Sequence, residues 1–179
     1  MSVLQSEHQL RVLSEPKEMT MQKKLILGCL VVAMTMSVAC FTVAEDMPGP
    51  DGEALWNHIS KVSPYTEWGY WDDHKGMIEG RAPHGKYHKV FVNKKGIDSV
   101  SAPVQYGTIQ VKENYGKKKD LKAITVMYKV KDYNPKSGDW FWAKYSPAGK
   151  VLKAGKLKGC IGCHSTRVAN DFVLVHEFK

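Results

Sequence analysis

The sequence predicts an α+β fold dominated by an antiparallel β-sheet, with a few short helices. Three observations support this prediction. Short runs of β-branched and aromatic residues recur between turn residues from residue 86 onward. Residues 107–115 alternate apolar and polar side chains with the period of a half-buried strand. Apolar residues at helical spacing occur mainly before this region, at residues 55–62.

The first expected element is a helix that begins near Gly52. Asp51 can cap it, because an aspartate side chain accepts hydrogen bonds from the free N–H groups of a first helical turn. Leu55 and Ile59 follow at helical spacing, and Pro64 ends the pattern. This helix is expected to bury one apolar face.

The remaining elements are strands separated by turns. Residues 65–73 are rich in aromatic side chains and are expected to be extended, and residues 74–84 are expected to form a loop. A turn is expected at residues 93–96, and a short helix or turn at residues 97–104. The expected strands are residues 86–93, 107–115, 121–131, 139–145, 150–154 and 172–178. The second of these strands places apolar Ile109 and Val111 on one face and polar Thr108, Gln110 and Lys112 on the other.

The N-terminal part has the layout of a secretory leader. Lys23 and Lys24 precede an apolar run at residues 25–38, and residues 42–44 resemble a signal-peptidase site. This layout predicts export to the periplasm. The expected organisation is a mis-called or disordered extension at residues 1–20, a signal peptide at residues 21–44 and a single domain at residues 45–179.

Two alternatives to a cleaved leader remain. The apolar run has about 14 residues, fewer than the roughly 20 that span a bilayer, and a membrane-anchored form is the first alternative. Lipidation at Cys40 is the second and weaker one, because Ser37 is a poor residue three places before a lipidated cysteine.

The chain is basic, with a formal charge of +8 at pH 7. A basic surface suits acidic redox partners or simply aids solubility. Its lysines are scattered and form no basic recognition helix. Nucleic acid is therefore not expected as a partner.

The cysteines carry the strongest signal. Cys29 and Cys40 lie in the leader, which leaves only Cys160 and Cys163, followed directly by His164. Cys-x-x-Cys-His is the attachment motif of c-type haem. Its two thiols lie on one side of a helical turn, where each can add to a haem vinyl group, and the next residue directs its imidazole at the iron. The motif predicts one covalently bound haem c with His164 as the proximal iron ligand.

Other interpretations of the motif are weaker. A thioredoxin-like pair needs no following histidine, and a zinc site needs two more ligands at finger spacing, which are not near. A structural disulfide is the remaining alternative. The ligand on the second face of the iron stays open. The candidates are Met47, Met77, Met127, His58, His74, His84, His88 and His176.

Further segments within residues 51–179 form a specific combination. They are Ala-Pro-His-Gly at 82–85, Val-Phe-Val-Asn at 90–93, Gly-Thr-Ile-Gln-Val-Lys-Glu-Asn-Tyr at 107–115, Met-Tyr-Lys-Val at 127–130 and Gly-Asp-Trp-Phe-Trp-Ala-Lys-Tyr at 138–145. Together with the C-terminal haem motif, they resemble the cytochrome P-460 and cytochrome c′-beta family.

This resemblance implies a largely antiparallel β fold, a homodimer and a five-coordinate haem with His164 as its proximal ligand. The cytochromes P-460 have a lysine bound covalently to the haem edge and oxidise hydroxylamine. The c′-beta members lack that activity and bind nitric oxide at an open distal site lined by phenylalanine.

The resemblance also assigns roles to individual residues. The cross-link lysine of the cytochromes P-460 matches Lys112, in the Val-Lys-Glu part of its strand. The family pattern places His84 and His88 on the distal side, with Phe91 close by. A histidine there can hydrogen-bond a bound ligand or move its protons. The alternatives are a solvent-facing lysine and surface or structural histidines.

One position departs from the family pattern. Some hydroxylamine-oxidising members have a carboxylate four residues after the haem histidine, where this chain has Val168. A carboxylate can accept protons from hydroxylamine and valine cannot. Asp171 and Glu113 are the candidates to replace it.

The sequence therefore predicts a periplasmic mono-haem cytochrome of the P-460 type that oxidises hydroxylamine or nitric oxide. A soluble cytochrome c is the expected electron acceptor. The first alternative is a c′-beta-like protein that binds nitric oxide without turnover, so the enzymatic activity is left open. The second alternative is an electron-transfer cytochrome c.

Overall fold

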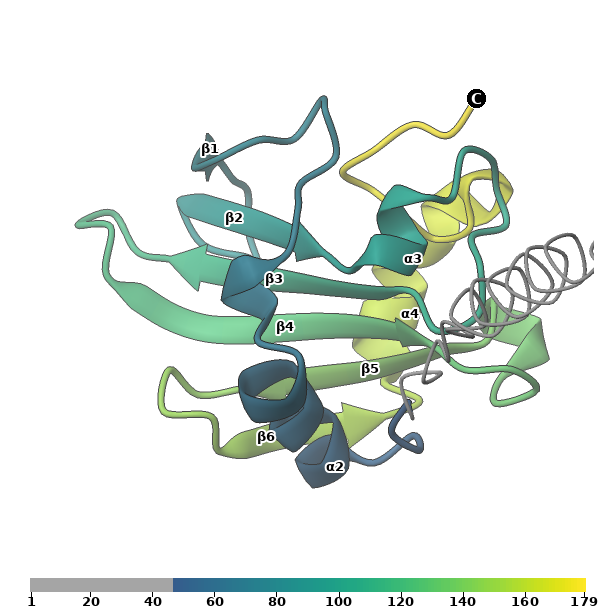
Figure 1. Cartoon of the computed structure of the whole chain (residues 1–179). Helices are drawn as coiled ribbons and strands as arrows, with labels where there is room; N and C mark the ends of the chain where they lie inside the picture. Colours follow the sequence, from purple (N-terminus) through teal and green to yellow (C-terminus); the bar gives the residue numbers. More distant parts are fainter. Residues whose placement is uncertain (1–46) are drawn as a thin grey trace, which may run out of the picture. The chain divides into compact units, whose positions relative to one another are not determined.

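The computed structural model describes residues 47–179, and the strands in this part form one six-stranded sheet (Figure 1). Every neighbouring pair of strands is antiparallel, and the order in the sheet follows the order in the sequence. The predicted α+β class with a mainly antiparallel sheet is confirmed. Among these residues, no helix is both long and apolar enough to cross a membrane. The predictions for residues 1–44 lie outside the described part.

The elements are short. The strands are β1 (Ile78–Glu79), β2 (Tyr87–Val92), β3 (Ile109–Tyr115), β4 (Leu121–Lys129), β5 (Trp140–Tyr145) and β6 (Val151–Gly155). The helical elements are α2 (Gly52–Asn57), η1 (His58–Val62), η2 (Tyr65–Glu67), α3 (Lys94–Ile97), η3 (Pro135–Ser137), α4 (Lys158–His164) and η4 (Ser165–Asn170).

One face of the sheet is covered by α2 and η1 (Figure 1). Leu55 and Ile59 from these helices are fully buried against apolar side chains of β3, β4 and β5. Val111 and Val126 are two of them and pair across the strands. Burial of this apolar surface is what holds the helices on the sheet.

The opposite face carries a second apolar cluster and a polar region. Met127 and Trp142 pair across β4 and β5 and pack with the C-terminal residues Phe172 and Val173. Helix α4 lies on this side, and its Ile161 contacts the same cluster. Farther along the strands this face becomes polar, and that polar end contributes to the cavity described below.

Several local predictions are confirmed. The Asp51 carboxylate accepts hydrogen bonds from the backbone N–H groups of Glu53 (3.0 Å) and Ala54 (2.9 Å), so it caps α2. The alternation in β3 is present, with Ile109 and Val111 in the cluster under α2. The Cys-x-x-Cys-His motif lies on a short helix, α4.

The prediction of a turn at residues 93–96 is wrong, because residues 94–97 form α3. The Asn93 side chain accepts a hydrogen bond from the backbone N–H of Gly96 (3.2 Å) and caps this helix. The same amide donates to the Gly107 carbonyl (2.8 Å), so it also joins the helix to the start of β3. A side chain that bonds two segments distant in sequence cannot be recognised from local turn composition.

The predicted strand at residues 172–178 is also wrong. Asp171 and Phe172 both adopt positive φ (51° and 65°), which turns the chain sharply at the end of η4. The Asn170 side chain then makes three hydrogen bonds of 2.6–3.1 Å with backbone groups of this segment. These bonds satisfy groups that a neighbouring strand would otherwise satisfy.

Candidate haem site

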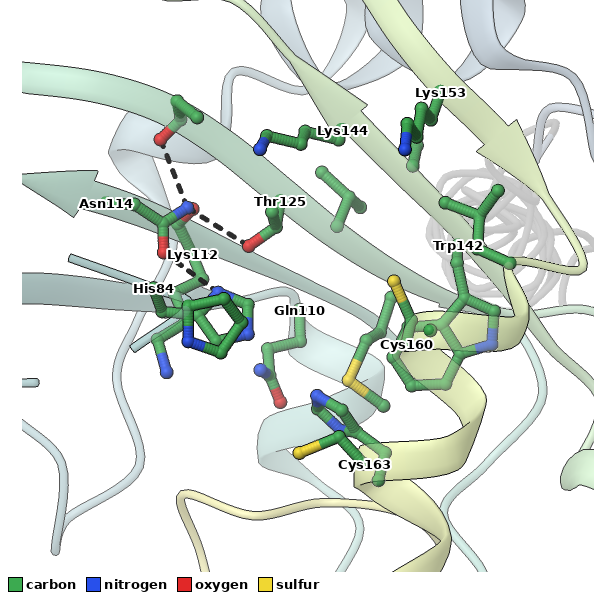
Figure 2. A pocket seen from close by; sticks show the side chains of 18 of the residues that line it. His84, Gln110, Lys112, Asn114, Thr125, Trp142, Lys144, Lys153, Cys160 and Cys163 are labelled. Carbon is green, nitrogen blue, oxygen red and sulfur yellow. Dashed lines mark hydrogen bonds between the residues drawn. The ribbon is translucent and has the colours of Figure 1, made fainter. Parts of the chain in front are cut away.

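A cavity of about 670 Å³ lies on the sheet face that carries α4. Its size is within the range of small-molecule and cofactor sites. Figure 2 shows side chains from the strands on one side and the cysteines of α4 on the other. The wall is formed by β3, β4, β5, β6, α4 and the segment 83–85. The polar residues in the wall are His84, Gln110, Lys112, Asn114, Lys122, Thr125, Lys144, Lys153, Lys158 and His164.

The predicted motif residues all reach this cavity. Cys160 and Cys163 line it, and neither takes part in a disulfide. Burial raises the pKa of the Cys160 thiol. His164 follows them in the wall and is buried, with its ring 4.7 Å from that of Trp142. The helix thus presents two thiols and an imidazole to one space.

The orientation of His164 is fixed by its backbone partner. Its Nδ1 lies 2.8 Å from the carbonyl oxygen of Phe172. A carbonyl only accepts hydrogen bonds, so Nδ1 carries the proton and Nε2 keeps a free lone pair. Burial lowers the pKa of His164, which also favours the neutral ring. This is the form in which histidine binds a metal.

A buried ion pair positions the Phe172 carbonyl. The amine of Lys129 lies 2.6 Å from both carboxylate oxygens of Asp171, and both side chains are buried. Asp171 also accepts a hydrogen bond from the backbone N–H of Val104 (2.9 Å). The ion pair therefore ties the residue before Phe172 to β4.

Lys112 projects from the polar face of β3 into the cavity (Figure 2). After burial, its positive charge is a further cause of the lowered pKa values of His84 and His164. Burial lowers the pKa of Lys112 itself to about 8. The structure therefore places Lys112 in the wall of the same cavity as the haem motif, with a larger share of neutral amine than an ordinary lysine has.

His84 also lines the cavity. Its Nδ1 lies 3.0 Å from the Asn114 side-chain oxygen on β3. Burial, and then the charge of Lys112, lowers the pKa of His84 to about 4, so its ring is neutral at pH 7. The following residue, Gly85, has φ +81° and lies against the Tyr115 carbonyl, where a side chain would collide. That glycine allows the turn that brings His84 to the wall.

His88 and Phe91 do not line the cavity. The Nε2 atoms of His88 and His74 are 2.7 Å apart and their rings stack, so His88 pairs with another histidine. Phe91 packs on the opposite face of the sheet against Tyr65 and Tyr70. The expectation that Phe91 lies close to the distal wall is wrong, because adjacent strand residues alternate between faces.

Neither proposed substitute for the missing carboxylate reaches the cavity. The Asp171 carboxylate forms the buried ion pair with Lys129. Glu113 lies on the other face of β3, where it accepts hydrogen bonds from the hydroxyl groups of Tyr65 (2.9 Å) and Tyr115 (2.5 Å). None of the described cavity-lining residues is an aspartate or glutamate.

The cavity fits a haem in three respects. Its wall contains apolar side chains of Met127, Leu157 and Leu174, which suit a flat apolar ring. Gln110 Oε1 and Trp142 Nε1 are buried polar atoms without a hydrogen-bond partner within residues 47–179. Such atoms in a cavity wall indicate a bound group.

The third respect is charge. Lys144 and Lys153 lie directly opposite each other on β5 and β6, and both line the cavity (Figure 2). Like charges placed opposite each other repel. The two carboxylates of a haem would offset this repulsion.

Sequence reasoning missed Asn114, Trp142, Lys144 and Lys153 as site residues. Asn114 and Lys144 each lie two residues from another cavity residue of the same strand, which is the spacing of one sheet face. That spacing could have indicated them. No local sequence pattern could have indicated that Lys144 and Lys153 lie opposite each other, because their pairing depends on the register of β5 and β6.

The sheet, the cavity and the motif helix together are those of a c-type haem cytochrome. A model of the cytochrome P460 family matches residues 63–175, and the chain belongs to this family. The family resemblance inferred from the sequence is confirmed. Membership implies a haem cofactor. A comparison with curated proteins finds no match for the chain.

Proposed function

We propose that this protein is a periplasmic mono-haem c-type cytochrome that binds and oxidises small nitrogen compounds such as hydroxylamine or nitric oxide. In this proposal Cys160 and Cys163 form thioether bonds to one haem, and His164 is the proximal iron ligand. Two motif thiols in one wall and a neutral, oriented imidazole support this assignment. A homodimer and a soluble cytochrome c as electron acceptor belong to the same proposal.

The observation that carries the P460-type assignment is the position of Lys112. It lines the same cavity as Cys163 and His164, and burial lowers its pKa to about 8. At pH 7 roughly a tenth of such amines are neutral, and only the neutral amine has the lone pair that a bond to a haem carbon uses. That bond replaces one N–H and one C–H bond, so its formation also requires a two-electron oxidant such as a peroxide. A solvent-facing lysine would have neither the location nor the lowered pKa.

The residues of the wall have distinct tasks in this proposal. The haem would supply a binding position for the substrate nitrogen and accept its electrons. His164 holds its position through the Phe172 carbonyl. His84 offers a neutral imidazole to an N–H or O–H of the bound compound. Since no described carboxylate lines the cavity, His84 is the side chain best placed to receive a proton.

The covalent attachment is tested by mass and by denaturation. The purified protein is expected to keep its haem after unfolding in acid, and its mass should exceed that of the processed chain by one haem. Replacing both cysteines, Cys160→Ala with Cys163→Ala, should release the haem on unfolding. Haem lost from the wild-type protein would contradict the thioether assignment.

The cross-link is tested by the optical spectrum of the dithionite-reduced protein. A modified haem shifts and broadens the Soret band to the red. Lys112→Leu should then restore an ordinary c-type spectrum, whereas Lys122→Leu, a lysine of the same cavity, should leave the spectrum as it is. An ordinary spectrum in the wild type would remove the cross-link from the proposal.

A c′-beta-like binding protein is the second candidate. The absence of aspartate and glutamate from the described cavity wall favours it, because proton removal from hydroxylamine then depends on histidine alone. Steady-state oxidation of hydroxylamine with a soluble electron acceptor separates the two candidates. Turnover that is lost in Lys112→Leu supports the enzyme, and nitric oxide binding without turnover supports the binding protein. An electron-transfer cytochrome, the third candidate, would bind neither compound.

A further inference from the structure

One residue lies at the centre of the cavity wall that the strands form. Thr125 of β4 pairs with Lys112 of β3 and with Lys144 of β5. Ala123 and Met127 lie two residues away along β4, on the same face of the sheet. All four neighbours line the cavity, as Thr125 itself does (Figure 2). The strand register therefore surrounds Thr125 with other residues of the wall.

The hydroxyl oxygen of Thr125 accepts a hydrogen bond from the Asn114 amide (3.1 Å). The same Asn114 nitrogen also donates to the carbonyls of Lys112 (3.0 Å) and Ala123 (3.1 Å). The amide cannot be reversed, because its oxygen would then face two carbonyl oxygens, which only accept. Within residues 47–179 no acceptor is found for the hydroxyl hydrogen of Thr125. That hydrogen is free to be donated into the cavity.

His84 fixes the Asn114 amide from its other end. Its Nδ1 lies 3.0 Å from the Asn114 side-chain oxygen, which only accepts, so Nδ1 carries the proton. The hydrogen bonds therefore run in one direction, from His84 to Asn114 and from Asn114 to Thr125 (Figure 2). Bonds in such a chain polarise one another, and this makes the Thr125 hydroxyl a stronger donor.

Other donors in the wall differ from Thr125 in position or in order. Trp142 Nε1 is buried without a partner among the described residues, but its indole packs against the ring of His164 (4.7 Å), the proposed proximal ligand. Lys112 and Lys144 carry amines that no hydrogen bond within the described part of the chain holds in place, and Lys144 is exposed. Thr125 combines a central position with a fixed orientation.

We propose that the Thr125 hydroxyl donates a hydrogen bond to the small nitrogen compound bound at the haem, and thereby favours compounds that carry an accepting atom. The inference rests on the haem proposed for this cavity. The iron lies at the centre of a haem ring, and Thr125 lies at the centre of the wall that the ring would face. Nitric oxide and hydroxylamine both have an oxygen next to the nitrogen, and this oxygen can accept from a hydroxyl.

The carbon monoxide complex of the ferrous, haem-loaded protein tests this role without turnover. A hydrogen bond to the carbon monoxide oxygen lowers the C–O stretching frequency, which infrared spectroscopy measures. Thr125→Val, which removes the hydroxyl but keeps the branched shape, should raise this frequency. Thr125→Ser, which keeps the hydroxyl, should stay near the wild-type value.

Thr108→Val is the matched control. It makes the same replacement at a fully buried threonine that does not line the cavity and whose hydroxyl has no partner within residues 47–179. It should leave the C–O frequency unchanged. Equal frequencies in the wild type and in Thr125→Val would overturn the inference while leaving the haem assignment intact.

Dissociation of nitric oxide from the ferrous protein gives a second measurement. Loss of one hydrogen bond should make nitric oxide leave Thr125→Val about 2- to 10-fold faster than it leaves the wild type. Thr108→Val should keep the wild-type rate, and an equal rate in Thr125→Val would contradict the proposed contact. A wild-type chain that holds no haem forms neither complex, and that result would overturn both the haem proposal and this inference.

Discussion

At the scale of single residues, the chemistry of each histidine near the cavity depends on its partner. Phe172 and Asn114 each present an oxygen to the Nδ1 of one cavity histidine and thereby expose its Nε2. His88 has a similar lowered pKa but a histidine as partner, so neither ring is free to turn into the cavity. The same residue type therefore supplies one candidate metal ligand, one neutral imidazole in the cavity wall and one structural pair.

The burial of His88 predicts a pH-dependent stability. Burial, and then the charges of Lys112 and His74, lowers its pKa to about 4, while in the unfolded chain it is near 6.5. Between these values the unfolded chain binds more protons, so the free energy of unfolding falls as the pH drops from about 7 to about 4. His88→Gln should reduce this fall by about 2 kcal/mol at pH 4.5.

Urea unfolding of the haem-loaded protein at pH 7 and at pH 4.5 measures this effect. The difference between the two pH values is compared in the wild type and in His88→Gln. The carboxylates and the other histidines are present in both proteins, so their contributions largely cancel in the comparison. An equal pH dependence in the two proteins would show that His88 is not the group responsible.

At the scale of elements, strand β3 determines which residues enter the cavity. Gln110, Lys112 and Asn114 line it, and Glu113 lies on the other face with Tyr65. Side chains along a strand alternate between the two faces, so neighbouring residues of β3 cannot share the cavity. A register shift of one residue would put Glu113 in the cavity in place of Lys112.

The cross-strand pair of Lys144 and Lys153 predicts an effect on the reduction potential. Removing one positive charge near the haem favours the oxidised form, so Lys153→Gln should lower the potential. The expected shift is roughly 10–40 mV, which corresponds to the 0.2–1 kcal/mol typical of exposed charge pairs. Redox titration measures it, with Lys118→Gln in the exposed turn before β4 as a control that should change the potential less.

Gly85, in the segment before β2, is predicted to be required for the backbone turn at His84. It has φ +81° and lies against the Tyr115 carbonyl, whereas Gly76 has φ +76° and open space around it. Gly76→Ala should cost about 1–2 kcal/mol of unfolding free energy for the backbone alone. Gly85→Ala should cost more, because the added side chain would also collide with the Tyr115 carbonyl. Urea unfolding measures both variants, and equal costs would contradict this role.

At the scale of the whole molecule, one ion pair connects the sheet to the C-terminal segment. Lys129 of β4 and Asp171 are both buried, and the Trp140 indole donates to the Asp171 carbonyl (2.8 Å). The carbonyl oxygen of the next residue, Phe172, accepts the hydrogen bond of His164 Nδ1. The stability of the fold and the orientation of the proximal histidine are therefore coupled through Asp171.

Asp171→Asn is predicted to destabilise the protein by about 3–5 kcal/mol, because it leaves the Lys129 amine buried without a counter-charge. The double variant Lys129→Met with Asp171→Asn should recover much of that loss, since it removes the uncompensated charge. Urea unfolding measures both. A double variant no more stable than the single one would show that the backbone bonds of Asp171, and not the charge pair, hold this segment.

The sequence by itself determined the haem motif, the family and the main strands of the sheet. These features are local: a fixed spacing of cysteines and histidine, an alternation of apolar residues, and turn residues between runs. It also indicated that Lys112 lies near the haem motif, although only through the resemblance. Local patterns are reliable here because strand period and helix caps act over a few residues.

The tertiary structure decided which of these residues meet. It removed Phe91, Glu113 and Asp171 from the site, because strand faces and a buried ion pair direct them elsewhere. It placed His84 opposite His164, although 79 residues separate them in the sequence. Contacts of this kind depend on strand register and on the packing of α4 against the sheet, and no local pattern contains that information.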